Sequence, residues 1–486
     1  MKNALLVATF AIAATLHAQD IPLFTSDFPP DEFAARRAKI YDAIGPTGIA
    51  VLQGAPSPAA YVRFRQGNDF YYLSGIEVPR AYLLLDGERR TTTLYLPHRN
   101  EARERGEGKM LSAEDADLVK KLSGIDTVAG TDALGEHLAR FAMASPARVL
   151  YTPFQPSEGT AMSRDLAIRV IADEAADPWG GGSSREGRFI ASLRERFPQF
   201  EIRNLSPALD QARLIKSARE MALIRKATRL ASEGILEAMR STVPGIKEYE
   251  LDAVAKYVFY RNGAQGDAYY SLIASGPNAI YPHYNAGKRT MLDGDFLLMD
   301  YAPDVGYYMS DVTRMWPVNG KFNAWQRELY GFYVACYRAI LDHIRAGATA
   351  ATIKDEAAAE MDQILARTKF SKPVYEAGAR SFVDSYKKSA PRLGHWVGMA
   401  THDVGSDTGP LRAGMVFTIE PALRVPEENI YIRLEDVIFI TDKGAEIVTR
   451  DLPMDMPSIE QVMKADGLLQ RYPAVASAPP APHEPR

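Results

Sequence analysis

Five residues in the second half of the sequence carry side chains that bind metal ions: Asp300, Asp311, His395, Glu420 and Glu435. Four of them are carboxylates, which are hard ligands, and the fifth is an imidazole. This set suits a pair of divalent ions such as Mn²⁺ better than a single Zn²⁺. Two bridged metal ions would activate a water molecule for hydrolysis. The pattern therefore predicts hydrolytic chemistry at a two-metal centre.

The two aspartates flank a predicted β-hairpin. An apolar run at residues 296–299 ends at Asp300, and residues 303–306 (Pro-Asp-Val-Gly) have the composition of a turn before Asp311. Because the two carboxylates lie at similar distances from this turn, we expect them to face each other. A carboxylate at the end of a buried strand is costly unless it is paired or binds a metal ion. Asp304 lies within the turn and is expected to be a turn former.

The other three candidate ligands lie in separate segments. His395 is flanked by glycines, which allow a ring to approach a crowded centre, and His402 follows seven residues later. Glu420 ends an apolar strand-like run. Arg433 and Glu435 are two residues apart, so they share one face of a predicted strand. Each histidine alone would more often be structural than a ligand, and the prediction rests on the five residues together.

The length of 486 residues predicts two domains that position these side chains. Residues 30–205 alternate helical and strand-like stretches, which is typical of a layered α/β domain. A second unit begins near Ser217, whose spacing from Glu220 predicts a capped helix over residues 217–239. Strands with tight turns follow from residue 269, with helices expected at 325–345 and 353–368. The glycine-rich segment 180–184 is expected to be a loop.

The composition argues against several classes of function. Lys and Arg number 57 against 61 Asp and Glu, and no long run of one sign occurs, so we expect no nucleic-acid partner. The single cysteine, Cys336, lies in an apolar stretch and is expected to be a core residue. One cysteine excludes an internal disulfide and a thiolate zinc site.

The two ends of the chain differ in composition from the rest. Lys2 precedes an apolar stretch at residues 4–16 that is too short for a stable membrane anchor, so residues 1–18 are predicted to be a signal peptide for export. An uncleaved anchor is the alternative, and a lipoprotein would need a cysteine that is absent. We expect no membrane span after the signal is removed. The Pro- and Ala-rich residues 473–486 are predicted to be a disordered tail.

Six segments of the second half form an ordered set: Tyr281-Pro-His283-Tyr, the Asp300 to Asp311 hairpin, Gly394-His395-Trp, Thr401-His402-Asp-Val-Gly405, Thr418-Ile-Glu420-Pro and Ile432-Arg-Leu-Glu435-Asp. The set resembles the aminopeptidase P and prolidase branch of the pita-bread metallopeptidases. Residues 64–75 resemble the hallmark of the N-terminal domain in that branch. The resemblance implies an α+β fold. A pita-bread catalytic domain (residues 213–470) would follow a smaller layered α/β domain of the creatinase, RNase H-like type (residues 22–210).

The resemblance also implies a role for each residue. Asp300 would chelate one metal ion, and His395 and Glu420 the other, while Asp311 and Glu435 would bridge both. Glu420 would also act as the general base. Three further side chains would lie outside the metal ligands. His283 and His402 would hold the peptide and stabilise the oxyanion, and Arg433 would orient neighbouring carboxylates.

Three positions depart from the family pattern. Pro391 stands where family members commonly carry a histidine beside the pocket for proline. Asp300 is followed by Tyr301-Ala302 instead of Ala-Gly, and Glu420-Pro is followed by Ala422 instead of Gly. Arg424 adds a positive charge nearby. These departures bear on selectivity for proline and leave the five ligands in place.

The resemblance leaves three functions open. The first is an Xaa-Pro aminopeptidase, which takes peptides with proline at the second position. The others are an Xaa-Pro dipeptidase (prolidase) and a catalytically inactive peptide-binding protein. The retained ligands favour an enzyme with two divalent ions, Mn²⁺ first, with Co²⁺ or Zn²⁺ as alternatives. Members of this family often assemble through the N-terminal domain, which implies a homo-oligomer, either a dimer or a tetramer.

Overall fold

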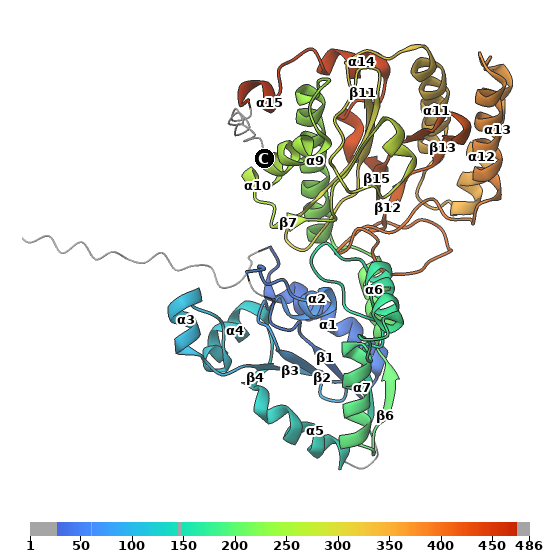
Figure 1. The fold of residues 1–486 in the computed structure, drawn as a ribbon. Helices are drawn as coiled ribbons and strands as arrows, with labels where there is room; N and C mark the ends of the chain where they lie inside the picture. The colour runs from blue at the N-terminus through green and yellow to red at the C-terminus, as the bar shows by residue number, and fades with distance from the viewer. Residues whose placement is uncertain (1–26, 60, 144–147, 474–486) are drawn as a thin grey trace, which may run out of the picture.

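The computed structural model describes residues 27–59, 61–143 and 148–473, and it places them in two lobes (Figure 1). The predicted signal peptide lies outside the described residues, as does the predicted tail after residue 473. No helix within these described ranges is long and apolar enough to cross a membrane.

The N-terminal lobe is built on one six-stranded mixed sheet in the order β4-β3-β2-β1-β5-β6. β1 pairs antiparallel with β2 and parallel with β5, and β3 pairs antiparallel with β2. The strands are β1 (Gly48–Gln53), β2 (Tyr82–Asp86), β3 (Thr91–Leu96), β4 (Thr127–Gly130), β5 (Val149–Thr152) and β6 (Glu201–Asn204).

Helices cover both faces of this sheet because alternate strand residues point to opposite sides. Along β1, Ala50 and Leu52 pack with α1, whereas Ile49 and Val51 pack with α5 and α7. The lobe's helices are α1 (Pro30–Ile44), α2 (Asn68–Ser74), α3 (Glu101–Glu107), α4 (Ala116–Ser123), α5 (Leu134–Ala142), α6 (Arg164–Ala176), α7 (Arg185–Arg196) and α8 (Ser206–Leu214). The predicted layered α/β domain is present.

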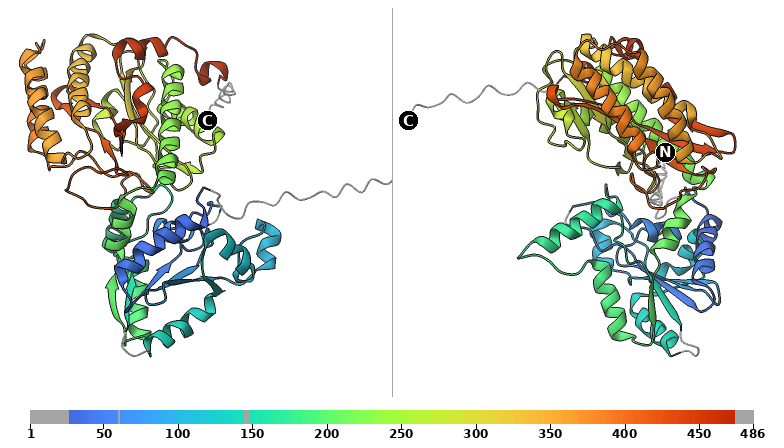
Figure 2. Two further views of the ribbon diagram at one scale, coloured as in Figure 1. Left: turned by 180° about the vertical axis from the view of Figure 1, so that it is seen from behind. Right: turned by 90° about the vertical axis from the view of Figure 1, so that its right-hand side faces the viewer.

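The C-terminal lobe places short, mainly antiparallel sheets between two groups of helices (Figures 1 and 2). α9 (Ala218–Ser241) and α10 (Glu248–Arg261) lie on one side, and α11 (Ala324–His343), α12 (Ala350–Arg367) and α13 (Pro373–Lys388) on the other. α9 begins with the predicted capping box, since Ser217 Oγ accepts from Glu220 N at 3.2 Å. Two short helices, α14 (Met456–Val462) and α15 (Leu468–Arg471), follow the last strand.

Three small sheets of the C-terminal lobe position the candidate ligands. In the first sheet, β9 (Phe296–Asp300) lies between β8 (Leu272–Ser275) and β11 (Thr313–Pro317). In the second sheet, β15 (Asp436–Thr441) lies between β12 (Val416–Ile419) and β16 (Gly444–Ile447). In the third sheet, β13 (Ala422–Val425) pairs with β14 (Ile430–Arg433). A backbone bridge between Thr313 and Glu435 joins the β11 and β15 segments. The ends of β9, β12 and β14 therefore meet at one place.

The predicted hairpin exists, but its connection is longer than a tight turn. β9 pairs antiparallel with β11, with Asp300 opposite Thr313, so Asp311 precedes the second strand by two residues. Pro303 and Asp304 form β10 and pair with β7 (Gly266–Asp267). Asp304 is buried and accepts from Arg65 Nε at 2.8 Å across the lobes. The expectation that Asp304 is only a turn former is therefore incomplete.

Candidate metal centre

The five predicted ligands converge on one buried point between the β-sheets. Ligand atoms of Asp300, Asp311 and Glu435 lie within 4.8 Å of one another, and so do those of His395, Glu420 and Glu435. The His395 Nε2 atom is 3.4 Å from Asp311 Oδ2 and 3.3 Å from Glu420 Oε1. The structure thus brings together side chains that are up to 135 positions apart in the sequence.

Local backbone geometry explains the glycine before His395. A Cβ on Gly394 would lie 2.0 Å from the carbonyl oxygen of Thr418, which no side chain tolerates. The close approach lets Thr418 N donate to His395 O at 2.9 Å. Gly394 therefore holds the histidine segment directly against β12, whose next residues lead to Glu420.

Burial and the repulsion between neighbouring carboxylates both disfavour negative charge at this centre. Burial and the neighbouring charge of Asp311 raise the pKa of Asp300 to about 8. Burial, with the charges of Asp311 and Glu420, raises the pKa of Glu435 well above its usual range. Burial alone would lower the pKa of His395, but its contacts with Asp311 and Glu435 raise it well above normal. The cluster favours added positive charge.

The donor set fits divalent cations. Glu435 Oε1 is buried and has no hydrogen-bond partner among the described residues, while its Oε2 accepts from Thr313 Oγ1 at 2.9 Å. A buried carboxylate oxygen without a partner is costly in a folded protein, and a metal ion would satisfy it. Four carboxylates with one imidazole is the ligand chemistry of paired divalent ions.

Arg433 is the cation closest to the carboxylates. Its guanidinium contacts Asp300 Oδ2 through Nη2 and lies 3.3 Å from Glu420 Oε2 through Nη1. Burial would lower the pKa of Arg433, but the charges of Asp300 and Glu435 raise it well above its usual value. Arg433 therefore stays charged and links two of the candidate ligands.

Tyr269 also contacts the site, although no motif in the sequence indicates it. Its hydroxyl donates to Asp300 Oδ1 at 2.5 Å and lies 2.6 Å from Asp311 Oδ1. The tyrosine precedes β8 and carries no sequence signal, because nothing in its neighbourhood resembles a ligand motif. It holds the two aspartates in a fixed relative orientation.

The two predicted peptide-binding histidines occupy different surroundings. The His402 ring lies 4.2 Å from the His395 ring, measured between centroids. His283 is exposed, and burial of part of its ring together with the charges of Arg433 and His402 lowers its pKa. Both histidines therefore border the cluster, His402 beside a ligand and His283 within range of its charges.

Glu248 holds the segment that carries His283. This fully buried carboxylate on α10 accepts from Ser275 N at 2.8 Å, from Tyr284 Oη at 2.9 Å and from Arg289 N at 3.2 Å. The three donors lie on both sides of His283 in the sequence. The segment is fixed in place although the histidine itself is exposed.

A cavity of about 410 Å³ adjoins the candidate ligand His395. Pro391, Trp396 and Phe417 are among the residues that line it. The position where family members commonly carry a histidine is thus on the wall of a space next to the centre. The departure at Pro391 makes this wall less polar.

Comparison with known proteins agrees with the geometry. Residues 222–442 match metallopeptidase family M24, and residues 33–151 match the aminopeptidase P N-terminal domain. The Xaa-Pro aminopeptidase of Escherichia coli (strain K12) is 29% identical over 460 residues, covering 90% of this chain and 99% of that protein. The Xaa-Pro aminopeptidase of Haemophilus influenzae is 27% identical over 460 residues, covering 90% and 99%.

The fold comparison points the same way. The structure of E. coli aminopeptidase P with the inhibitor Pro-Leu superposes with a TM-score of 0.74 at 25% sequence identity, covering 90% of this chain and 99% of that one. The expected architecture, a pita-bread domain preceded by a smaller α/β domain, is confirmed.

Proposed function

Because the chain belongs to the aminopeptidase P branch of metallopeptidase family M24, we propose that it is an Xaa-Pro aminopeptidase. Such an enzyme hydrolyses the bond between an N-terminal residue and a following proline, whose tertiary amide and fixed φ distinguish it from other peptide bonds. The observation that carries the proposal is the convergence of four carboxylates and one imidazole on one buried point.

We assign the metal ligands to the five residues of the cluster. Asp300 would chelate one divalent ion, His395 and Glu420 the other, and Asp311 and Glu435 would bridge both. When bound, the ions supply Lewis-acid activation of a water molecule. Mn²⁺ is our first assignment, with Co²⁺ and Zn²⁺ able to use the same ligands.

Other steps of the reaction are assigned to Glu420, Arg433 and the two histidines near the cluster. Glu420 is the most exposed of the carboxylate ligands, with 29% of its side chain accessible, and is placed to accept a proton as the general base. Arg433 holds Glu420 and Asp300 in position. His283 and His402 would hold the peptide and stabilise the negative charge that develops on the carbonyl oxygen.

Substrate length distinguishes the proposed activity from the alternatives. We expect the metal-loaded protein to release the first residue from Xaa-Pro-Pro tripeptides and longer peptides. Activity confined to Xaa-Pro dipeptides would identify a dipeptidase instead. Peptide binding without cleavage, at saturating Mn²⁺, Co²⁺ or Zn²⁺, would identify an inactive peptide-binding protein.

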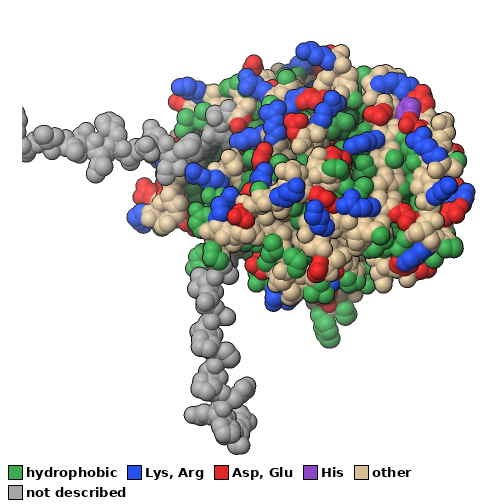
Figure 3. Space-filling model, turned by 90° about the horizontal axis from the view of Figure 1, so that it is seen from above, with side chains coloured by type: hydrophobic (Ala, Val, Ile, Leu, Met, Phe, Trp, Pro, Cys, Tyr) green, Lys and Arg blue, Asp and Glu red, His purple; other side chains and the backbone are tan. Residues whose placement is uncertain are grey.

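The assembly and destination of the chain are further parts of the proposal. We propose a homo-oligomer (dimer or tetramer), export through residues 1–18, and a domain division at 22–210 and 213–470. On the face seen in Figure 3, acidic and basic side chains are interspersed, in keeping with peptide rather than nucleic-acid partners. Light scattering of the purified protein and N-terminal sequencing of the mature chain test the first two statements.

A further inference from the structure

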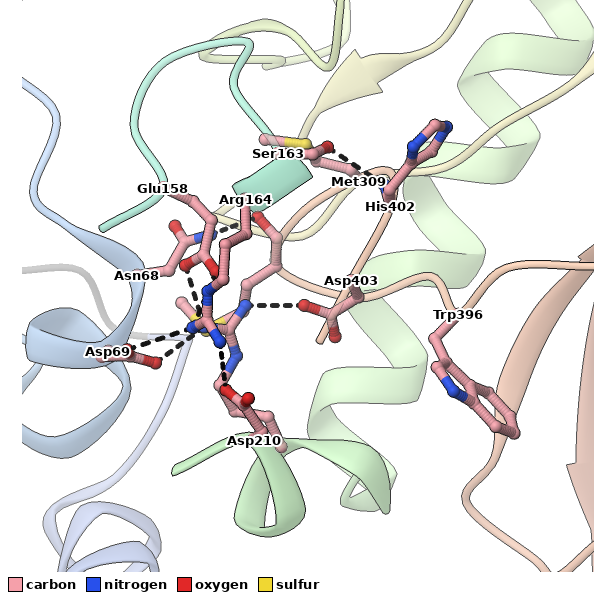
Figure 4. Close-up of polar contacts among 12 residues, drawn as sticks. Asn68, Asp69, Glu158, Ser163, Arg164, Asp210, Met309, Trp396, His402 and Asp403 are labelled. Carbon is pink, nitrogen blue, oxygen red and sulfur yellow. Dashed lines mark hydrogen bonds and ion pairs between the residues drawn. The ribbon is translucent and has the colours of Figure 1, made fainter. Parts of the chain in front are cut away.

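The first turn of α6 reaches from the N-terminal lobe to the segment that carries His402. Asp165 Oδ2 lies 2.9 Å from His402 Nδ1, and His402 N donates to Ser163 Oγ at 3.1 Å (Figure 4 shows the second contact). Ser163 is the N-cap residue of α6, yet its side chain makes no capping bond to its own helix. Its hydroxyl accepts a hydrogen bond from the backbone N–H of His402 instead, so the start of this helix holds His402 in place.

A buried ion network fixes both sides of the contact. Arg164, next to Asp165, lies 3.0 Å from Glu158 and 2.6 Å from Asp210. Asp403, next to His402, lies 2.6 Å from Arg213. Figure 4 shows Arg164 close to Glu158 and Asp210, with Asp403 nearby.

Arg213 connects Asp403 to the carboxylates of the N-terminal lobe. Its Nη1 atom is 2.7 Å from Asp69 Oδ1 and 3.0 Å from Glu158 Oε2, and less than a tenth of each of these three side chains is exposed. Ions that satisfy one another in this way at low exposure have little freedom to move. The spacing of Asp165 and His402 is therefore set by their neighbours in the sequence.

The chemistry of the contact determines which nitrogen of His402 carries a hydrogen. An ionised carboxylate only accepts hydrogen bonds, so Nδ1 must donate. Burial would raise the pKa of Asp165, but the contact with His402 and hydrogen bonds from backbone N–H groups together lower it, so Asp165 stays ionised. Nε2 is then the ring nitrogen left for a substrate.

We propose that Asp165 is a positioning residue, which fixes the ring orientation and the tautomer of His402 from the other domain. This inference rests on the proposed function, because His402 acts on a peptide there. The side chains of His402 and Asp165 are 39% and 51% exposed, so their contact contributes little to stability. Substitution of Asp165 thus separates positioning from folding.

Three variants of Asp165 test the proposal by steady-state kinetics with a tripeptide substrate. Asp165→Ala lowers kcat roughly 10-fold, the scale expected for a side chain that orients a functional histidine, with KM little changed. Asp165→Asn has the same shape, but its amide can donate to Nδ1 and favour the opposite tautomer, so it loses a similar amount. Asp165→Glu keeps a carboxylate and recovers part of the activity. Asp173→Ala, on the same helix and exposed, is the control and behaves as wild type.

A second readout does not depend on turnover. In metal-free, ¹⁵N-histidine-labelled full-length protein, with the signal assigned through His402→Gln, the chemical shifts report a hydrogen on Nδ1 of wild-type His402. Asp165→Ala and Asp165→Asn shift this signal towards the other tautomer. A wild-type signal with the hydrogen on Nε2, or an Asp165→Asn variant with wild-type kcat, would overturn the proposal. Wild-type protein without Xaa-Pro activity, but with the predicted ¹⁵N signature, would contradict the proposed function and leave the positioning of His402 supported.

Discussion

Asp311→Ala is expected to lower hydrolysis of an Xaa-Pro-Pro peptide by about 10³-fold or more, because removing one group of a catalytic unit disables the whole unit. Asp311 is the proposed bridge between the two ions, and its Oδ2 atom lies 3.4 Å from Nε2 of the proposed ligand His395. The metal-free fold should survive. Loss of this charge relieves the repulsion that raises the pKa of Asp300, so we expect unchanged or higher thermal stability without metal.

Metal analysis accompanies the kinetics of this variant. Wild-type protein is expected to bind two divalent ions per chain, and Asp311→Ala fewer. Asp293→Ala serves as the matched control, since this exposed aspartate precedes β9 and lies outside the cluster. Asp311→Ala protein that retained wild-type turnover would show that Asp311 is not a bridging ligand.

Arg213→Met is expected to cause the largest loss of stability, about 3–5 kcal/mol, the range for breaking a buried ion pair by removing one partner. Arg213 is about 1% exposed and contacts Asp69, Glu158 and Asp403. Methionine fills much of the volume but leaves these carboxylates with too few positive partners. Burial already raises the pKa of Glu158, so the remaining charges are poorly accommodated.

Urea unfolding followed by circular dichroism measures this loss. Arg203→Met is the control, because Arg203 pairs with Glu201 on the surface of β6 and should leave the unfolding midpoint unchanged. Because Arg213 also holds Asp403, folded Arg213→Met protein should lose turnover as well. An Arg213→Met midpoint equal to that of the control would mean that the network does not stabilise the domain junction.

The candidate ligand set could be predicted because Asp300, Glu420 and Glu435 lie at or beside the ends of apolar strands and His395 lies next to a glycine. Asp300 is a carboxylate at the end of the apolar strand β9, and a charged side chain in such a place is unusual enough to be recognised from the sequence. The capped start of α9 at Ser217 and the helix Glu248–Arg261 were predictable for similarly local reasons. The order of the candidate ligands along the chain indicated the family that the sequence resembles.

The parts that were missed depend on contacts between distant segments. Tyr269 binds two aspartates 31 and 42 positions away, and Asp165 meets His402 across 237 positions. α6 itself was not predicted, because its apolar residues do not follow one clear stripe. The loop after β9 is buried because Tyr307 stacks on Tyr71 of the other lobe, with ring centroids 3.6 Å apart. Turn composition alone does not reveal this contact with the other lobe.

The most direct test of the account is a metal titration with product analysis by mass spectrometry. Metal-free protein is mixed with a peptide carrying proline at position two and with a matched peptide carrying alanine there, while Mn²⁺ is added stepwise. We predict release of only the first residue from the proline peptide, with a rate that rises until two ions are bound per chain. Cleavage at another bond, equal cleavage of the alanine peptide, or full activity without metal would contradict it.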